Sequence, residues 1–349
     1  MAARTPLASV FTGDAEIAAL FGAAAEIAAM LRFEAALARA EADVGTLAPD
    51  AAEAIEAAIG GFAPDEAAIR AGMAKDGVPI PVLVKQLRAA VGEAHGGLVH
   101  RGATSQDAVD TGLALRLQEV LAILAGRVEA LLALLEHLTE TQGTTPLMAQ
   151  TRMQAALPFT AADKLATWAR PLAQHRDRLA ALKSGLPLQL GGPIGNRTSF
   201  GPGYPALRAA LAARLGLRDA APWQSDRTVI LDIAQALALL AGTLGKIGQD
   251  LALMAQNELG AVQLAGGGAS SAMAHKQNPV GAEVLVALAR FNGGLLGTLA
   301  QSMVHENERS GAAWTLEWLI LPQMAESTGA ALAQALALFD GLRFVALRR

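Results

Sequence analysis

Apolar residues recur along most of the chain with the spacing of helices and without the strict alternation of strands. Alanine and leucine dominate, and both are strong helix formers, whereas alternating β-branched residues are nearly absent. Several of the predicted helices are about twice the usual helix length. We therefore expect an all-α protein built as a bundle of long helices. The predicted helices span residues 15–44, 80–94, 105–141, 159–184, 204–215, 225–264, 280–307 and 314–339.

In the predicted helix over 225–264, residues 230–264 are apolar on most faces, with Leu237, Leu240, Leu244 and Leu251 spread around the helix. A helix that is hydrophobic all round is buried on all sides. Because several long helices share this character, we expect an obligate oligomer whose subunits share one helical core. Glycines near residue 96 predict a soft boundary between an N-terminal helical domain (1–95) and a central long-helix domain (96–349).

Composition and charge exclude several classes of protein. Of 349 residues, 52% are hydrophobic and 17% charged, which is too apolar for a disordered chain. The net charge of -4 lacks the basic footprint of a nucleic-acid binder. The absence of cysteine excludes disulfides and thiolate metal sites. We find no signal-peptide pattern and no run of the roughly 18 uncharged apolar residues that a membrane span needs, so we expect a cytoplasmic protein.

Polar chemistry is concentrated in three short patches, of which the first spans residues 100–107. It contains His100, Thr104, Ser105 and Gln106. One interpretation is a loop followed by a helix that Thr104 or Ser105 caps. The other is that hydroxyls and backbone N–H groups at the helix N-terminus form a site for an anion.

The second and third patches carry further donors. Thr151, Arg152 and Gln154 fit either a surface loop or a set of carboxylate donors. The third patch, 266–279, begins with three glycines and ends at Pro279, where a new helix is expected to start. Its reactive groups are Ser270, Ser271, His275, Lys276 and Asn278.

The third patch resembles the signature of the fumarase/aspartase superfamily. Ser270, Met273, Lys276 and Asn278 match it, while Ala269 replaces a glycine. The first two patches are similar to the other two conserved regions, in the same order. The resemblance implies a homotetramer of long helices, active sites that draw the three patches from different subunits, and neither cofactor nor metal. Family members usually continue into a small third domain, which is largely missing here.

The resemblance also implies roles for these residues. Ser270 exchanges the proton on carbon, and Lys276 stabilises the charge that develops there. The expected substrate contacts are His100, Thr104, Ser105, Gln106, Thr151, Arg152, Gln154, Ser271, Met273, His275 and Asn278.

Within the superfamily, residues 100–111 and 305–318 are similar to the cycloisomerase branch, which lactonises the tricarboxylate 3-carboxy-cis,cis-muconate during protocatechuate degradation. Adenylosuccinate lyases have a histidine, a general acid, where this chain has Arg152. An arginine stays protonated, so it is a poor acid and a good carboxylate clamp. Three alternatives remain: an adenylosuccinate lyase-like enzyme that releases fumarate from adenylosuccinate or argininosuccinate, a non-catalytic helical structural protein, and an α-helical membrane or lipid-binding protein suggested by hydropathy alone. Arg309 could either reach a substrate carboxylate or pair with Glu306 or Glu308, and we expect the ion pair.

Overall fold

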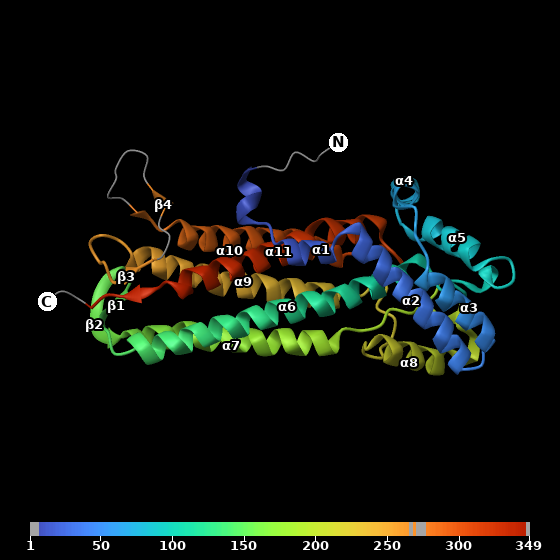
Figure 1. Cartoon of the computed structure of the whole chain (residues 1–349), viewed down its shortest axis with the longest axis horizontal. Helices are drawn as coiled ribbons and strands as arrows, with labels where there is room; N and C mark the ends of the chain where they lie inside the picture. The colour runs from blue at the N-terminus through green and yellow to red at the C-terminus, as the bar shows by residue number, and fades with distance from the viewer. Residues whose placement is uncertain (1–6, 265–267, 270–276, 347–349) are drawn as a thin grey trace.

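The computed structural model describes residues 7–264, 268–269 and 277–346 (Figure 1). Helices make up 71% of the structure, which confirms the all-α prediction. Five long helices lie side by side and form an elongated bundle (Figure 1). They are α6 (Ser105–Gln142), α7 (Ala161–Gly185), α9 (Thr228–Met254), α10 (Val280–Leu299) and α11 (Gly311–Asp340).

Shorter helices gather mainly at one end of the bundle, on the right in Figure 1. The predicted helix over 15–44 is in fact two helices, because the chain breaks at Phe21 and Gly22 and each part has its own cap. Two further helices, α3 and α4, were not predicted from the sequence. The shorter helices are α1 (Ala15–Leu20), α2 (Ala23–Asp43), α3 (Pro49–Gly60), α4 (Glu66–Asp76), α5 (Ile80–Val91) and α8 (Tyr204–Leu215), with 3-10 turns at Leu7–Phe11, Gly96–Leu98, Thr198–Gly203 and Ala300–Met303.

The opposite end of the bundle carries a β-hairpin that the sequence reasoning missed. Strands β1 (Pro146–Thr151) and β2 (Gln154–Thr160) pair antiparallel between α6 and α7. Two further pairs of two-residue strands complete the β structure described: β3 (Val262–Gln263) pairs with β6 (Arg343–Phe344), and β4 (Gly268–Ala269) with β5 (Gln277–Asn278). Helix α7 begins after the hairpin because Thr160 and Asp163 form a capping box.

Two helices end earlier than the sequence predicted. Helix α9 stops at Met254 instead of residue 264, where the N–H of Ala261 donates to the carbonyl of Met254 and Gly260 adopts φ 54°. That left-handed conformation is open to glycine and turns the chain toward β3. Helix α10 gives way to a 3-10 turn after Leu299.

Helices α9 and α10 pack at very short range through glycines. A Cβ atom on Gly248 would lie 2.6 Å from the carbonyl oxygen of Ala282, and one on Gly245 would lie 2.3 Å from the Cβ of Ala289. Both distances are shorter than real Cβ contacts, so the two backbones approach this closely only because these positions carry no side chain.

Apolar surface remains on the bundle. Helix α9 and the segment Val280–Met303 are each long and apolar enough, by length and composition alone, to cross a membrane, a test that core helices of soluble proteins also pass. Only 50% of the apolar window of α9 and 22% of that of α10 are buried within the chain. Leu239 and Phe291 are 43% and 40% exposed on these helices. The all-round burial expected of α9 is therefore not reached inside one subunit.

The close approach of α9 and α10 predicts a sharp difference between two glycine substitutions on α9. Gly248→Ala should lower the free energy of unfolding by about 1–3 kcal/mol, because the new methyl group forces the helices apart. Gly242→Ala should be neutral or stabilise by up to about 1 kcal/mol, since nothing lies within 4 Å of its Cβ position. Chemical denaturation measures both, and equal effects would contradict the packing described.

Candidate functional site

The first polar patch lies at the N-terminus of α6, as the sequence predicted. Thr104 is the N-cap residue, and its N–H donates to Oδ2 of Asp107 at 3.0 Å. The side chains of Thr104 and Ser105 are partly exposed. The start of a helix of 38 residues therefore presents two hydroxyls and the positive end of its dipole.

Asp107 fixes the loop that packs against this helix start. Its Oδ1 accepts from the N–H of Gly191 at 2.7 Å and from Nε2 of Gln189 at 3.1 Å, and its Oδ2 accepts from the N–H of Gly192 at 2.9 Å. Burial raises the pKa of Asp107 to about 6, although these backbone and side-chain donors act in the opposite direction. The carboxylate therefore joins the loop 189–192 to the N-terminus of α6.

His100 lies beside the helix start in a partly buried position. Its Nδ1 is 2.6 Å from Oε1 of Glu34, whose side chain is 1% exposed. Burial disfavours the imidazolium, but the charge and hydrogen bond of Glu34 outweigh this and raise the pKa of His100 above its usual value. His100 lines a cavity of about 510 Å³ together with Lys85, Arg88 and Thr104. The cavity combines cationic groups with hydroxyls, a lining that suits an anion.

The contacts of Arg309 differ from the ion pair with Glu306 or Glu308 that the sequence predicted. Among the described residues it forms no ion pair with Glu306 or Glu308. Its Nε donates to Oε1 of Gln106 at 2.9 Å, and its Nη2 lies 3.3 Å from Oγ1 of Thr104. The predicted ion pair is therefore wrong, because the guanidinium turns inward toward the start of α6.

A buried group of charges below this site was missed in the sequence analysis. Arg227, Asp110 and Glu317 each have side chains that are 0% exposed. Arg227 donates to Asp110 at 2.6 and 3.1 Å and to Glu317 at 2.6 and 2.9 Å. These bonds raise the pKa of Arg227 against the effect of burial, which alone would lower it. Only Glu317 stood out in the sequence, as a lone charge among apolar residues, whereas Asp110 and Arg227 lie close to other charged residues.

The second patch forms the tip of the β1–β2 hairpin, at the other end of the bundle (Figure 1). Thr151, Arg152, Met153 and Gln154 are all exposed there. Arg152 and Met153 have φ of 50° and 65°, a left-handed conformation that costs residues other than glycine about 1–3 kcal/mol and is concentrated at functional sites. His100, in the first patch, has φ 63°.

A cavity of about 230 Å³ lies behind this hairpin, between its strands and the ends of α7 and α9. Arg152 and Met148 line it from the hairpin, and Lys164 and Asp250 from the helices. Lys164 Nζ lies 2.8 Å from Oδ2 of Asp250, an atom that also accepts from Nε1 of Trp168 at 2.8 Å. The charged groups of the helices are therefore bonded to one another beside the hairpin.

The third patch lies largely outside the described residues. Ser270, Ser271, Met273, His275 and Lys276 belong to that portion of the chain. Asn278 is half-buried in β5, where it pairs with Gly268. Pro279 directly precedes α10, as the sequence predicted.

One chain does not bring the three patches together. The N-terminus of α6 and the hairpin that follows its C-terminus lie at opposite ends of the bundle, and β4 and β5 lie at the hairpin end (Figure 1). At about 1.5 Å per residue, α6 separates them by roughly 55 Å. Among the residues that the structure describes, no group of three His, Asp or Glu side chains is arranged to hold a metal ion.

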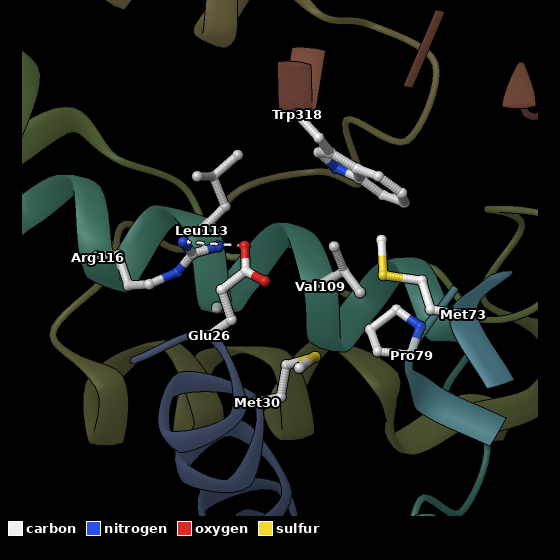
Figure 2. Close-up of a pocket in the computed structure, with 9 residues that line it drawn as sticks. Glu26, Met30, Met73, Pro79, Val109, Leu113, Arg116 and Trp318 are labelled. Carbon is white, nitrogen blue, oxygen red and sulfur yellow. Dashed lines mark ion pairs between the residues drawn. The ribbon is translucent and has the colours of Figure 1, made fainter. Parts of the chain in front are cut away.

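A smaller cavity of about 60 Å³ lies further along α6 (Figure 2). Figure 2 shows Glu26 and Arg116 joined by an ion pair of 3.3 Å, with Met30, Val109 and Trp318 around them. Its volume is far below the roughly 510 Å³ of the cavity beside His100. The larger cavity beside His100 is therefore the better candidate for part of a ligand site.

Comparisons with known proteins agree with the family inferred from the sequence. A lyase family model matches residues 9–291. The chain is 41% identical over 342 residues to the 3-carboxy-cis,cis-muconate cycloisomerase of Pseudomonas aeruginosa, covering 96% of this chain and 74% of that protein. The crystal structure of 3-carboxy-cis,cis-muconate lactonizing enzyme from Pseudomonas putida is similar at a TM-score of 0.89 and 36% identity, over 98% of this chain and 78% of that one. Nitrosuccinate lyase of Streptomyces davaonensis is 36% identical over 328 residues, covering 90% of this chain and 69% of that protein.

The contact between His100 and Glu34 predicts a titration. The pKa of His100 should lie above 6.5, and Glu34→Gln should bring it below that value, because burial then acts without the carboxylate. His100 contributes stability that is full below pH 6.5 and is lost as the pH rises through its raised pKa. NMR titration of the histidine ring protons measures both proteins. An unchanged pKa in the variant would contradict the assigned cause.

Proposed function

The chain belongs to the lyase family of the fumarase/aspartase superfamily, and on that premise we propose that it is a cycloisomerase that lactonises 3-carboxy-cis,cis-muconate. The observation that carries the proposal is the similarity, along nearly the whole chain, to cycloisomerases from several bacteria. The enzyme would act in the breakdown of aromatic compounds such as protocatechuate.

The reaction is an internal addition. One carboxylate oxygen of the substrate forms a bond to an alkene carbon and closes the lactone ring, while the π electrons move to the neighbouring carbon, which is α to another carboxylate. That carbon then takes a proton. The main task is to stabilise the developing carbanion, whose charge spreads into its carboxylate, and preorganised donors usually supply the largest share of such stabilisation.

The described residues support the binding half of this task. The substrate carries three carboxylates, and the cavity at the start of α6 offers His100, Lys85 and Arg88 with the hydroxyls of Thr104 and Ser105. Glu34 favours the charged form of His100. In our proposal one substrate carboxylate lies against these groups and the helix N-terminus.

In our proposal the hairpin and the third patch supply the remaining substrate contacts, the proton donor and the groups that stabilise the developing charge. Thr151, Arg152 and Gln154 bind a second carboxylate from the hairpin tip. Ser270 donates the proton to carbon, and Lys276 with Asn278 stabilises the enolate-like charge. Ser271, Met273 and His275 complete the wall around the substrate, and no cofactor or metal is required.

Arg152 favours cycloisomerisation over fumarate release. A lyase whose nitrogen leaving group must be protonated needs an acid near that atom, and a guanidinium does not give up its proton at any working pH. In lactone opening, the reverse reaction, the leaving group is a carboxylate that needs no proton. The similarity to a nitrosuccinate lyase keeps a second candidate, a lyase acting on a small dicarboxylate with a nitrogen substituent.

We also propose that the enzyme is a cytoplasmic homotetramer whose active sites combine patches from different subunits. Two observations support this: the patches lie at opposite ends of one chain, and α10 leaves most of its apolar surface uncovered. In this arrangement residues 1–95 form a small helical domain beside the first patch, and residues 96–349 form the shared bundle.

The proposal predicts rapid loss of the ultraviolet absorbance of the conjugated diene when the protein is mixed with 3-carboxy-cis,cis-muconate made in place from protocatechuate. NMR of the product should show a lactone. Ser270→Ala should slow the reaction by roughly 10²–10⁴-fold, the usual contribution of a positioned proton donor, with nearly normal substrate binding.

A protein that is folded and oligomeric yet leaves the diene intact would overturn the cycloisomerase assignment. Release of fumarate from adenylosuccinate, or of fumarate and nitrite from nitrosuccinate, would then establish the lyase alternative. Normal turnover by Ser270→Ala would instead remove Ser270 from its assigned role and leave the reaction assigned.

A further inference from the structure

Gln106 is buried in a way that does not suit a substrate ligand. Its side chain is 0% exposed, although its neighbours Thr104 and Ser105 are partly exposed. Its Nε2 donates to Oδ2 of Asp110 at 3.0 Å and to the carbonyl of Gln224 at 2.7 Å. Both N–H donors of the amide are therefore used inside the chain, which leaves none for a carboxylate from solution.

The oxygen of the same amide faces a cation. Oε1 of Gln106 accepts from Nε of Arg309 at 2.9 Å. The amide thus points its N–H toward the carboxylate of Asp110 and its C=O toward a guanidinium, with its dipole aligned between the two charges. The flipped amide would place oxygen against carboxylate and N–H against guanidinium, so the charges permit one orientation. Hydrogen bonds in such a chain strengthen one another.

Asp110 is a rigid anchor at the buried end of this series of hydrogen bonds. Asp110 is 0% exposed and also accepts two bonds from Arg227 and one from Nε1 of Trp314 at 3.0 Å. Arg227 is held in turn by Glu317. Since every partner is buried and bonded, the position of the Asp110 carboxylate is set from three separate helices and loops.

Arg309 lies at the outer end of this series of hydrogen bonds. It is partly exposed, and its Nη2 lies 3.3 Å from both Oγ1 of Thr104 and the carbonyl of Pro193. Among the described residues its Nη1 has no hydrogen-bond partner. The guanidinium therefore lies over the start of α6 with one edge bonded to the protein and one nitrogen left for an anion.

We propose that Gln106 is a positioning residue. It links the Arg309 guanidinium by hydrogen bonds to the buried Asp110–Arg227–Glu317 group, and Arg309, held in this position, binds a carboxylate of the substrate beside Thr104. This replaces the direct substrate contact that the sequence predicted for Gln106. The inference rests on the proposed function, because it assigns a carboxylate-binding cation to the site of that reaction.

The test is Gln106→Met, which keeps the length of the side chain and removes all three hydrogen bonds. KM for 3-carboxy-cis,cis-muconate should rise about tenfold or more, the size expected for loss of a charged contact. The value of kcat should change less than about threefold, since an interaction made equally in ground and transition states is lost. Gln118→Met is the matched control, because Gln118 lies on the same helix and loses one bond to the carbonyl of Gly216. It should leave KM unchanged.

Arg309→Lys tests the same contact from its other side, and it serves as the test if the Gln106→Met protein does not fold. Lysine retains the positive charge, but its single ammonium group cannot donate to Gln106 and Thr104 at once from one planar group. The KM of this variant should therefore rise by a similar factor. In the double variant the two effects should not add, because both break the same contact.

Normal KM in Arg309→Lys, or in a folded Gln106→Met protein, would overturn the inference while wild-type turnover upheld the proposed function. Full additivity in the double variant would also overturn it. Absence of turnover in the wild-type protein would overturn the proposed function itself, and binding of the tricarboxylate, measured by calorimetry on wild type and variants, would then test the positioning role alone.

Discussion

The length of α6 is the constraint on which the arrangement of the site depends. Its 38 residues separate the first polar patch from the hairpin that follows by roughly 55 Å. A substrate with three carboxylates on one short diene cannot contact both ends of one chain. The exposed apolar surface of α10 and the glycine-mediated packing of α9 on α10 are consistent with a bundle that continues into other subunits.

Electrostatics at the start of α6 follow from two buried carboxylates with different tasks. Asp107 holds the loop 189–192 against the helix through N–H donors, and Asp110 holds Arg227 and the amide of Gln106. Burying charge is costly unless every partner is in place. The result is a rigid base beneath cationic groups that point outward, which is the property that a site for anions requires.

The sequence predicted the long helices and the family well, because alanine and leucine periodicity and the pattern Ser270, Met273, Lys276 and Asn278 are local signals. It missed the hairpin, since Arg152 and Met153 occupy left-handed turn positions without glycine or asparagine. It also gave the wrong partner for Arg309, and it did not predict the burial of Gln106. Their roles depend on partners about a hundred or more residues away, and nothing in local spacing reports such contacts.

Mixing of subunits tests the central claim most directly. One parent would carry Thr104→Val with Ser105→Ala at the start of α6, and the other Ser270→Ala in the third patch. Hybrid oligomers, purified by two different tags, should recover turnover of 3-carboxy-cis,cis-muconate that neither parent shows, because some sites then receive intact patches from different subunits. Hybrids as inactive as both parents would contradict a site shared between subunits.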